Sequence, residues 1–600
     1  MRSFSFPAII FLLFASTAMA QKNKAEDKRL AGIDTAISRI LKEWKVAGAS
    51  VAVVEKNKLL FVKGYGFKDF EKKVPVTENT LFAIGSCTKA FTSSLMGMLE
   101  KEGKLDIDKP VHNYLPELEF YNEWLTNHIT TRDMMTHRTG LPRHDYSWYG
   151  SSASRDSLLH RIRYLEPSAQ LRERWQYNNF MFLAQGVLAE KLYGKKWEDI
   201  VREKIFQPLE MTRSNFSVAD LQKAPDFTFG YKESKDSVIR MDYMNIDPIG
   251  PAGSINSSAA EMSNWLITWI NGGKYKDKQV IPASYVSQAI TGQMTTGGGL
   301  PSKESPDIHG GSYGFAWMTY SYRGHYLVEH GGNIDGFSAS TAFYPSDSIG
   351  IVVLVNQNAS PVTTLIRNVI SDKMFNLKTK NYSGILKEVI AKSKAVNIEK
   401  RNADSLLRKP GTKPSHALND YTGRYYNPGY GTIEITNLKD TLRVEFNNSK
   451  GKIYLEHYHY DFFKIRSNDD EGENSSKINF LTNLKGEIGS FETSLEPTVK
   501  DILFTRLPAD IKLDSNAMNR YVGEYEIAGM VARVYIRGGN TLMLVVPGQP
   551  EYELVATKEH EFDLKGLKGF SVKFDTDDAG KTPGLNFIQP NGIFKAVRKK

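Results

Sequence analysis

The last third of the chain contains an internal repeat, and this repeat restricts the folds that the chain can adopt. The segment YTGRY at residues 421–425 recurs as YVGEY at 521–525, and the segments FLTNLKG and FDTDDAG follow them in the same order. Both copies also contain stretches of alternating apolar and polar residues, which are typical of strands. The repeat therefore predicts two small all-β modules, residues 415–510 and 511–600, each folded as an antiparallel, lipocalin-like barrel.

The chain before residue 378 has a different pattern, in which helices separate two groups of strands. The segment GASVAVVEKNKLLFVKGYG predicts a hairpin that turns at Lys56 and Asn57, and SASTAFYPSDSIGIVVLVN predicts a second pair of strands. The segments FLAQGVLAEKL and AAEMSNWLITWI have helical spacing. Together they predict one α/β domain over residues 21–377, with a sheet assembled from distant parts of the chain. Residues 378–414 are charged and end in RKPGTKPS, which indicates a linker with a helical start.

The first twenty residues have the features of a secretory signal peptide. Arg2 precedes the apolar run FPAIIFLLFA, and Ala18-Met19-Ala20 forms a small-x-small cleavage pattern. No later segment approaches the length of a membrane span. Cys87 is the only cysteine, so no disulfide can form within the chain. We therefore expect a periplasmic or secreted protein that is cleaved near Ala20 and has no membrane span.

Charge and motifs argue against several other classes of function. The formal net charge is +9, but basic residues alternate with acidic ones and form no basic block, so we expect no nucleic-acid partner. The sequence has no phosphate loop and no H-E-x-x-H motif. His457 and His459 have strand spacing, but two ligands without a third favour an aromatic packing cluster over a metal site. We expect no cofactor and no metal.

Ser86 and Lys89, in the segment AIGSCTKAFTSSLMGML, are the first candidates for a catalytic site. Three positions apart on a helix, two side chains lie on one face within reach of each other. A serine hydroxyl is a poor nucleophile until a base takes its proton, and a neighbouring lysine can take part in that transfer. A helix start also offers N–H donors to a developing oxyanion. Ser449 and Lys452 have the same spacing, but they lie in a polar turn without companion motifs.

The first pair has companions further along the chain. The segment RWQYNNF supplies Tyr177-x-Asn179, and VEHGGNIDGFSAS supplies His330-Gly331-Gly332. In this order, the three motifs resemble those of the serine β-lactamase and penicillin-binding superfamily, and most of all its class C β-lactamase, D-aminopeptidase and esterase branch. The stretches ITTRDMMTHRTGLP, GPAGSINSSAAEMSNWL and SYGFAWM resemble the same branch, so the resemblance covers most of the predicted α/β domain.

The resemblance implies a fold and a set of catalytic roles. The fold is an α/β (α+β) domain of the β-lactamase and transpeptidase type, with an antiparallel sheet and a helical cluster. Ser86 would attack the substrate carbonyl and become acylated, while Lys89 and Tyr177 would share the proton transfers. Asn179 would donate a hydrogen bond to the substrate amide or to Lys89.

The third motif implies substrate binding. Its strand would pair with the substrate backbone, and the N–H groups of Ser86 and Asn333 would form the oxyanion hole. Gly331 and Gly332 lack a Cβ, which lets a ligand come close to the strand. His330 stands where β-lactamases usually have lysine, which counts against a dedicated β-lactamase. In the alternative interpretation, His330 is a buried polar residue that orients the strand without meeting the substrate.

The resemblance implies a secreted serine hydrolase that acts through an acyl-enzyme on amide or ester bonds. The expected partner is a small-molecule or peptide substrate: a D-amino-acid peptide, an ester or a β-lactam-like compound. The competing hypothesis is a non-catalytic binder or sensor of peptidoglycan fragments, although the intact Ser86, Lys89 and Tyr177 argue against it. In relatives with appended domains, those domains shape the substrate pocket or mediate assembly, which leaves open a homo-oligomer formed through the β modules.

Overall fold

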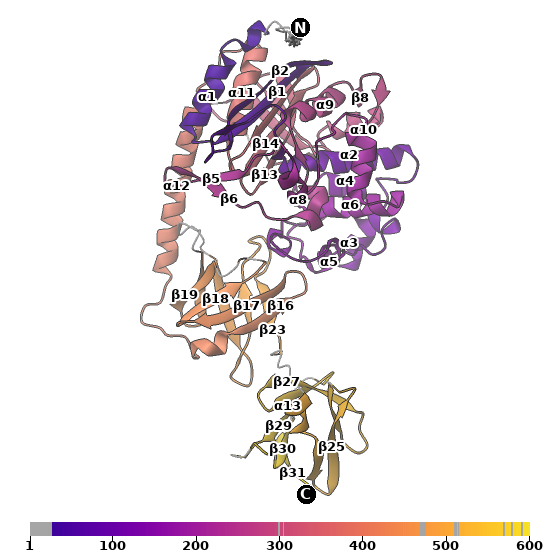
Figure 1. Cartoon of the computed structure of the whole chain (residues 1–600), viewed down its shortest axis with the longest axis vertical. Helices are drawn as coiled ribbons and strands as arrows, with labels where there is room; N and C mark the ends of the chain where they lie inside the picture. Colours follow the sequence, from indigo (N-terminus) through magenta and orange to yellow (C-terminus); the bar gives the residue numbers. More distant parts are fainter. Residues whose placement is uncertain are drawn as a thin grey trace, which may run out of the picture.

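The computed structural model of the chain describes residues 27–599, apart from positions 298–300, 304, 448, 450–451, 468–475, 509–512, 514, 540, 568–569, 578–579 and 590–591. The predicted signal peptide therefore lies outside the described residues. Among the residues that are described, no helix is long and apolar enough to cross a membrane. The described chain forms a large α/β domain followed by two β barrels (Figure 1).

A nine-stranded antiparallel sheet forms the centre of the large domain, and it joins the two ends of this segment. The strand Gly48–Glu55 pairs on one side with the strand Lys58–Asp69, the second strand of the predicted hairpin. On its other side it pairs with the strand Ile349–Val355, near the end of the domain. This confirms the sheet built from distant parts of the chain. The strand order is β10 (Met294–Thr295), β11 (Ile308–Tyr313), β12 (Met318–Tyr322), β13 (His325–Ile334), β14 (Phe337–Tyr344), β15 (Ile349–Val355), β1 (Gly48–Glu55), β2 (Lys58–Asp69) and β3 (Val74–Pro75).

Helices cover both faces of the sheet, so successive strand residues pack into two different cores (Figure 1). In β1, Val51 and Val53 pack into the core on one face, whereas Ala52 and Val54 pack into the core on the other. Burial on both faces explains why this strand is a continuous apolar run. The first face carries α1 (Ile33–Glu43) and α11 (Val362–Met374). The second carries a helical cluster: α2 (Thr88–Lys101), α3 (Glu123–His128), α4 (Thr131–Met135), α5 (Arg155–Arg161), α6 (Phe180–Tyr193), α7 (Trp197–Val201), α8 (Val218–Lys223), α9 (Ala259–Ile270) and α10 (Ala283–Ala289).

The chain enters α2 from a short two-stranded sheet, and this positions the Ser86 segment. β4 (Phe82–Ala83) pairs with β7 (Asn256–Ser257), and the Ile84 N–H donates to the Ile255 carbonyl at 3.0 Å. Every α2 residue from Thr88 to Leu99 is buried. A helix that is buried all round lies in the middle of a core, so α2 brings its polar residues into a desolvated environment. The remaining short strands pair as β5 (Gly230–Ser234) with β6 (Ser237–Met241), and β8 (Lys274–Tyr275) with β9 (Lys278–Gln279).

The segment predicted as a linker is mostly one long helix, α12 (Tyr382–Leu406), which contains no buried residue. Near its end, Asp404 forms ion pairs with Lys464, at 2.7 Å, and with Lys477 of the first barrel. The helix therefore runs from the α/β domain to the first barrel along the outside of the molecule (Figure 1).

Both predicted β modules are closed barrels of eight antiparallel strands, which confirms the fold predicted from the repeat. The first barrel contains β16 (Gly423–Asn427), β17 (Gly431–Leu438), β18 (Thr441–Glu445), β19 (Ile453–His459), β20 (Phe462–Ser467), β21 (Lys477–Thr482), β22 (Ile488–Thr493) and β23 (Ile502–Arg506). After α13 (Ser515–Asn519), the second contains β24 (Gly523–Ile527), β25 (Met530–Arg537), β26 (Thr541–Val545), β27 (Tyr552–Lys558), β28 (Glu561–Leu564), β29 (Ser571–Asp575), β30 (Gly584–Gln589) and β31 (Gly592–Arg598).

The repeated sequence motif closes each barrel at the same point. In the first barrel, Tyr425 on the first strand stands opposite Arg506 on the last strand, and the buried Tyr425 hydroxyl donates to the Tyr421 carbonyl at 3.0 Å. A methyl group at Gly423 would lie 2.9 Å from Arg506 Nε, so glycine leaves room for the arginine. The second barrel repeats these contacts with Tyr521, Gly523, Tyr525 and Arg598.

We predict that Tyr425→Phe destabilises the first barrel, whereas Tyr426→Phe does not. Tyr425 is fully buried and its hydroxyl serves a buried carbonyl, so its loss costs about 1 kcal/mol or more. Tyr426 is next to it on the same strand but is 43% exposed, so the same change there stays within about 0.5 kcal/mol. Scanning calorimetry measures both; equal midpoints for the two variants would contradict the assignment of this hydrogen bond.

Candidate active site

Ser86 lies just before α2, where its backbone passes directly against β13. Gly85 has a φ of +50°, in the left-handed region that favours glycine. A methyl group at Gly85 would lie 2.8 Å from the Asn333 nitrogen, and one at Gly332 would lie 1.9 Å from the Ile84 carbonyl oxygen and 3.1 Å from the Ser86 nitrogen. Glycine at both positions therefore lets the two segments meet, with the Asn333 nitrogen next to Gly85 and the Ser86 nitrogen next to Gly332.

Lys89 is completely buried one helical turn after Ser86. Its Nζ lies 3.0 Å from Ser86 Oγ, 2.7 Å from Asn179 Oδ1 and 2.7 Å from the Ala252 carbonyl oxygen. Burial lowers the pKa of Lys89 well below its usual value, because the ammonium form is desolvated, and the charge of Arg143 acts in the same direction. The structure thus places this amine between the serine and two fixed oxygen atoms.

Asp145 fixes the orientation of the Asn179 side chain. Asn179 immediately precedes α6, and its Nδ2 donates to Asp145 Oδ1 at 3.0 Å. Because a carboxylate accepts only, the amide must turn its oxygen towards Lys89. Asp145 is in turn held by Arg143 Nε, at 2.6 Å, and by the Trp148 indole N–H, at 2.8 Å.

Tyr177 lies against the same lysine. Lys89 Nζ is 4.8 Å from the centre of the Tyr177 ring, and Arg143 lies over that ring at 4.9 Å. Burial raises the pKa of the Tyr177 phenol, although its hydrogen bond with Ser86 acts in the opposite direction. Ser86, Lys89, Tyr177 and Asn179, from two motifs far apart in the sequence, are therefore brought together.

His330 is buried on β13 and points to neighbouring protein groups. Its Nδ1 lies 2.6 Å from the Gly331 carbonyl oxygen and its Nε2 lies 2.9 Å from the Tyr313 hydroxyl. The carbonyl only accepts, so Nδ1 carries the proton and Nε2 accepts from Tyr313. Burial lowers the pKa of His330 to about 3, so the ring is neutral. His330, Gly331 and Gly332 are not among the residues that line the pocket, and their contact with substrate stays a prediction.

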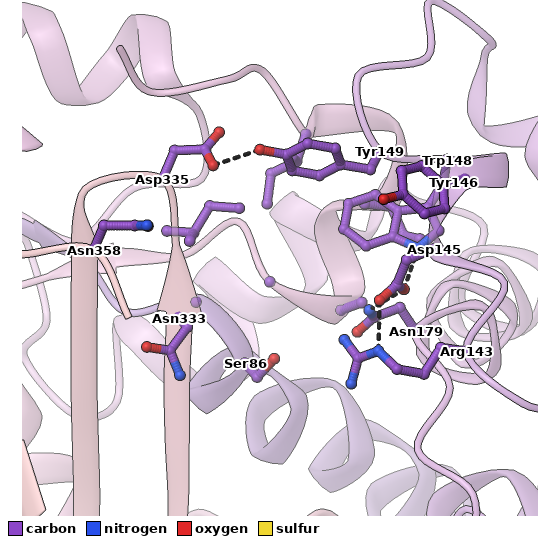
Figure 2. Close-up of a pocket in the computed structure, with 16 residues that line it drawn as sticks. Ser86, Arg143, Asp145, Tyr146, Trp148, Tyr149, Asn179, Asn333, Asp335 and Asn358 are labelled. Carbon is purple, nitrogen blue, oxygen red and sulfur yellow. Dashed lines mark hydrogen bonds and ion pairs between the residues drawn. The ribbon is translucent and has the colours of Figure 1, made fainter. Parts of the chain in front are cut away.

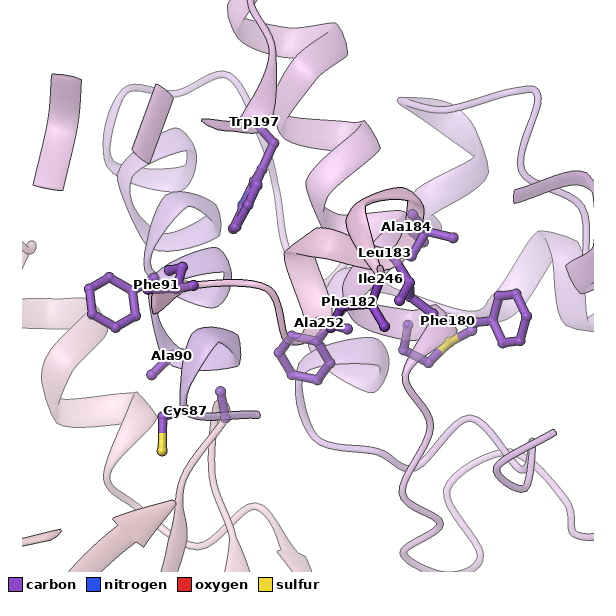
Figure 3. Packing of buried hydrophobic residues seen from close by; sticks show 14 of the residues in the cluster. Cys87, Ala90, Phe91, Phe180, Phe182, Leu183, Ala184, Trp197, Ile246 and Ala252 are labelled. Carbon is purple, nitrogen blue, oxygen red and sulfur yellow. The ribbon is translucent and has the colours of Figure 1, made fainter. Parts of the chain in front are cut away.

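Cys87 is buried in the core and its thiol lies against β13. Its Sγ lies 3.2 Å from the His330 carbonyl oxygen, and burial raises the pKa of the thiol to about 11. Figure 3 shows Cys87 just before α2, and Ala90 and Phe91 on α2, with Phe182 in the same buried core. Ile246, Ile249 and Ala252 of the pocket wall belong to the same core, so the core that packs around α2 extends to the pocket.

A pocket of about 450 Å³ opens beside Ser86 (Figure 2). Asn179 and Asn333 line it, as their predicted roles require. Its other lining residues come largely from the loop after α4, from the turn after β13 and from residues before β7; they are Gly85, Arg143, Asp145, Tyr146, Trp148, Tyr149, Ile246, Ile249, Ala252, Gly253, Ile334, Asp335 and Asn358.

Sequence reasoning missed the charged and aromatic members of this wall. Arg143, Asp145, Trp148 and Tyr149 all lie in the segment RHDYSWYG, which directly follows the recognised stretch ending in TGLP. The dense group of charged and aromatic residues in this segment could have marked it as part of the pocket wall. Asp335 follows the HGGN segment by only two positions, but nothing in its spacing marks it as a pocket residue.

The first barrel contacts the loop after α4, whose residues line the pocket. The buried His144 donates its backbone N–H to Glu496 at 3.0 Å, and its Nδ1 accepts from the Tyr430 hydroxyl at 2.7 Å. The Ser147 hydroxyl donates to the Gly429 carbonyl at 2.5 Å. The loop therefore turns His144 and Ser147 to the barrel and the residues on either side of them to the pocket, so the barrel forms part of the support of the site.

Comparisons with known proteins assign the family. The β-lactamase family model matches residues 33–370, so the chain belongs to the β-lactamase family, the group of serine hydrolases and penicillin-binding proteins that its motifs predict. A model for a domain of unknown function, DUF3471, matches residues 407–506, which include the first barrel.

Individual relatives agree with this assignment. The unguisins hydrolase ungD' of Aspergillus campestris is 30% identical over 421 residues, which is 66% of this chain and 76% of that protein. Protein flp of Staphylococcus aureus is 25% identical over 56% of this chain and 65% of its own length. The octameric penicillin-binding protein homologue from Pyrococcus abyssi has a TM-score of 0.54 at 20% identity, covering 79% of this chain and all of that one, which shows a shared fold.

We predict that Gly332→Ala disrupts the contact between β13 and the Ser86 segment, whereas Gly331→Ala is tolerated by the fold. A methyl group at Gly332 meets the Ile84 carbonyl at 1.9 Å, but at Gly331 its nearest neighbour is 3.7 Å away. Overpacking against backbone costs about 1–3 kcal/mol. Thermal unfolding of both variants measures this difference, and an unchanged midpoint in Gly332→Ala would show that the two segments are not in contact.

Proposed function

We propose that this chain is a serine hydrolase that forms an acyl-enzyme on Ser86 and cleaves an amide or ester bond. The set of atoms around Lys89 Nζ carries this proposal. Asn179 Oδ1 and the Ala252 carbonyl accept only, so each takes one N–H from the amine. A neutral amine has two N–H bonds, and its lone pair then remains for the Ser86 hydroxyl at 3.0 Å. Lys89 is thus arranged as the base that takes the serine proton.

The directions of the two pKa shifts divide the proton work between Lys89 and Tyr177. Burial favours the neutral form of both groups, which makes the lysine a base and the phenol an acid. A tyrosinate acting as the base would need a lowered pKa, and burial moves it the other way. We therefore assign the first proton transfer to Lys89 and the delivery of a proton to the leaving group to Tyr177.

The proposed reaction has two stages, acylation of Ser86 and then hydrolysis of the acyl-enzyme. The Ser86 proton moves to Lys89 Nζ while Oγ bonds to the substrate carbonyl carbon, and the oxyanion lies by the backbone N–H groups of Ser86 and Asn333. The bond to the leaving group breaks as that group takes the Tyr177 proton, which the Lys89 ammonium replaces. Water then attacks the ester carbonyl, releasing the acid and restoring the Ser86 hydroxyl.

The substrate class is a D-amino-acid peptide, an ester or a β-lactam-like compound. A relative named as an unguisins hydrolase supports hydrolysis. Nothing in the site favours the alternative of a non-catalytic binder, since binding alone does not require a base beside a nucleophile. We also propose secretion, based on the signal peptide at residues 1–20, and leave assembly through the β modules as a prediction.

The nucleophile is tested by covalent labelling. A fluorophosphonate probe is expected to add its mass to the peptide that contains Ser86, and Ser86→Ala is expected to abolish the label. Ser449→Ala, at the second serine with the same spacing to a lysine, is the matched control and keeps the label. Labelling that persists in Ser86→Ala would place the nucleophile elsewhere.

The base is tested by the pH profile of kcat/KM on one neutral ester. Protonated Lys89 cannot accept the serine proton, so activity is low at acid pH, rises as Lys89 loses its proton, and levels off well below the usual lysine pKa. Arg143 lowers the pKa of Lys89, so Arg143→Gln is expected to move the rising limb to higher pH.

Arg163→Gln removes an exposed arginine whose partner is Glu119 and serves as the control with an unshifted profile. Lys89→Ala is expected to lose roughly a hundredfold or more in kcat/KM. Near-normal activity in Lys89→Ala would contradict the role of the lysine.

A further inference from the structure

Asp335 is a buried carboxylate on the pocket wall that the reaction above does not use. It lies in the turn between β13 and β14, is only 7% exposed and lines the pocket (Figure 2). Its Oδ1 accepts from the Tyr149 hydroxyl at 2.5 Å and its Oδ2 accepts from the Met244 N–H at 3.3 Å. A carboxylate has about four acceptor positions, so these two neutral donors leave about half of them free.

The charges of the pocket leave Asp335 without a cation. Three charged side chains line the pocket, and two of them, Arg143 and Asp145, form an ion pair with each other. Among the described residues, no lysine, arginine or histidine forms an ion pair with Asp335. Burial raises the pKa of Asp335, because the hydrogen bonds from Tyr149 and Met244 offset only part of the desolvation of its charge. Buried charges are normally paired, so this wall lacks one positive charge.

We propose that Asp335 and Tyr149 form a subsite for a primary ammonium group of the substrate. An ammonium has three donors and carries the missing charge, so it satisfies the free acceptor positions of the carboxylate. Tyr146, Trp148 and Tyr149 supply aromatic rings on the same pocket wall, which also favour a cation. The inference rests on the proposed hydrolysis at Ser86 and names its substrate class: acyl groups that carry an amine.

The position of the subsite sets the distance between the amine and the bond that is cleaved. Asp335 follows Asn333 by two residues and lies in the turn beyond the end of β13, so it is set further along the strand direction than the Asn333 N–H. In Figure 2 the Asp335–Tyr149 pair stands apart from Ser86, across the pocket from Arg143. An α-ammonium is only two bonds from the reacting carbonyl carbon and stays near Ser86, whereas the Asp335 carboxylate stands apart from Ser86. The fitting amine is several bonds away, at the end of a side chain or at the amino terminus of the preceding residue.

Matched esters test this subsite in the full-length chain. p-Nitrophenyl 6-aminohexanoate is compared with p-nitrophenyl hexanoate for a side-chain-like amine, and the glycylglycine p-nitrophenyl ester with its N-acetyl form for an amino terminus. We expect kcat/KM for at least one amine-bearing ester to exceed that of its neutral match by about tenfold or more. Asp335→Asn is expected to remove that preference. The pair that shows the preference identifies the source of the amine.

Asp242→Asn is the control, since it removes the same charge from an exposed residue of the neighbouring segment and is expected to keep the preference. An equal preference in Asp335→Asn and the intact chain, or no preference in the intact chain, overturns the subsite while leaving hydrolysis intact.

If no ester is turned over and Ser86 is not labelled, the proposed hydrolysis fails, and the subsite is decided by binding alone. Hexylammonium and hexanol are then titrated calorimetrically into the intact chain and Asp335→Asn. Binding of hexylammonium only, lost in the variant, supports the subsite. Equal binding in both proteins, or none in the intact chain, overturns it.

Discussion

The burial of one amine is the constraint on which the rest of the site depends. Lys89 is held in the first turn of a helix that is buried from Thr88 to Leu99, where a charged ammonium is costly and a neutral amine is stable. A buried amine in this position needs a complete set of hydrogen-bond partners, since an unsatisfied buried polar group would destabilise the fold. The Ala252 carbonyl, the Asn179 amide and the Ser86 hydroxyl supply them, so the same contacts that permit burial also arrange the proton transfer that we propose.

A chain of contacts extends from this amine to the surface of another domain. Asn179 is oriented by Asp145, and Asp145 lies in the loop whose neighbouring residue His144 is bound by Glu496 and Tyr430 of the first barrel. This loop is therefore hydrogen-bonded on both sides, to Asn179 of the α/β domain and to the first barrel. The first barrel therefore contacts the loop that carries Asp145, although none of the barrel residues lines the pocket.

The sequence predicts the parts of this structure that repeat or follow a period. Ser86 and Lys89 have helical spacing, and the two barrels are visible in the repeat because the tyrosine and arginine of each copy meet where the barrel closes. Asp145 and Asp335 were not predicted, since they lie in a loop and a turn, where no period relates sequence to position. His330 shows a third case: its motif is recognisable, but only the structure shows that its ring turns towards Tyr313.

The position of β1 in the sheet has a consequence for how the domain is made. β1 stands between β2, which follows it at once, and β15, with Ala49 opposite Val355, about 300 residues later in the chain. Synthesis runs from the amino terminus, so one edge of the apolar hairpin stays open until almost the whole domain has emerged. Such distant pairing slows folding and exposes a strand edge to other chains meanwhile. The order of strands thus requires that the free edge of β1 be protected while the domain is being synthesised. In the folded sheet β15 covers this edge.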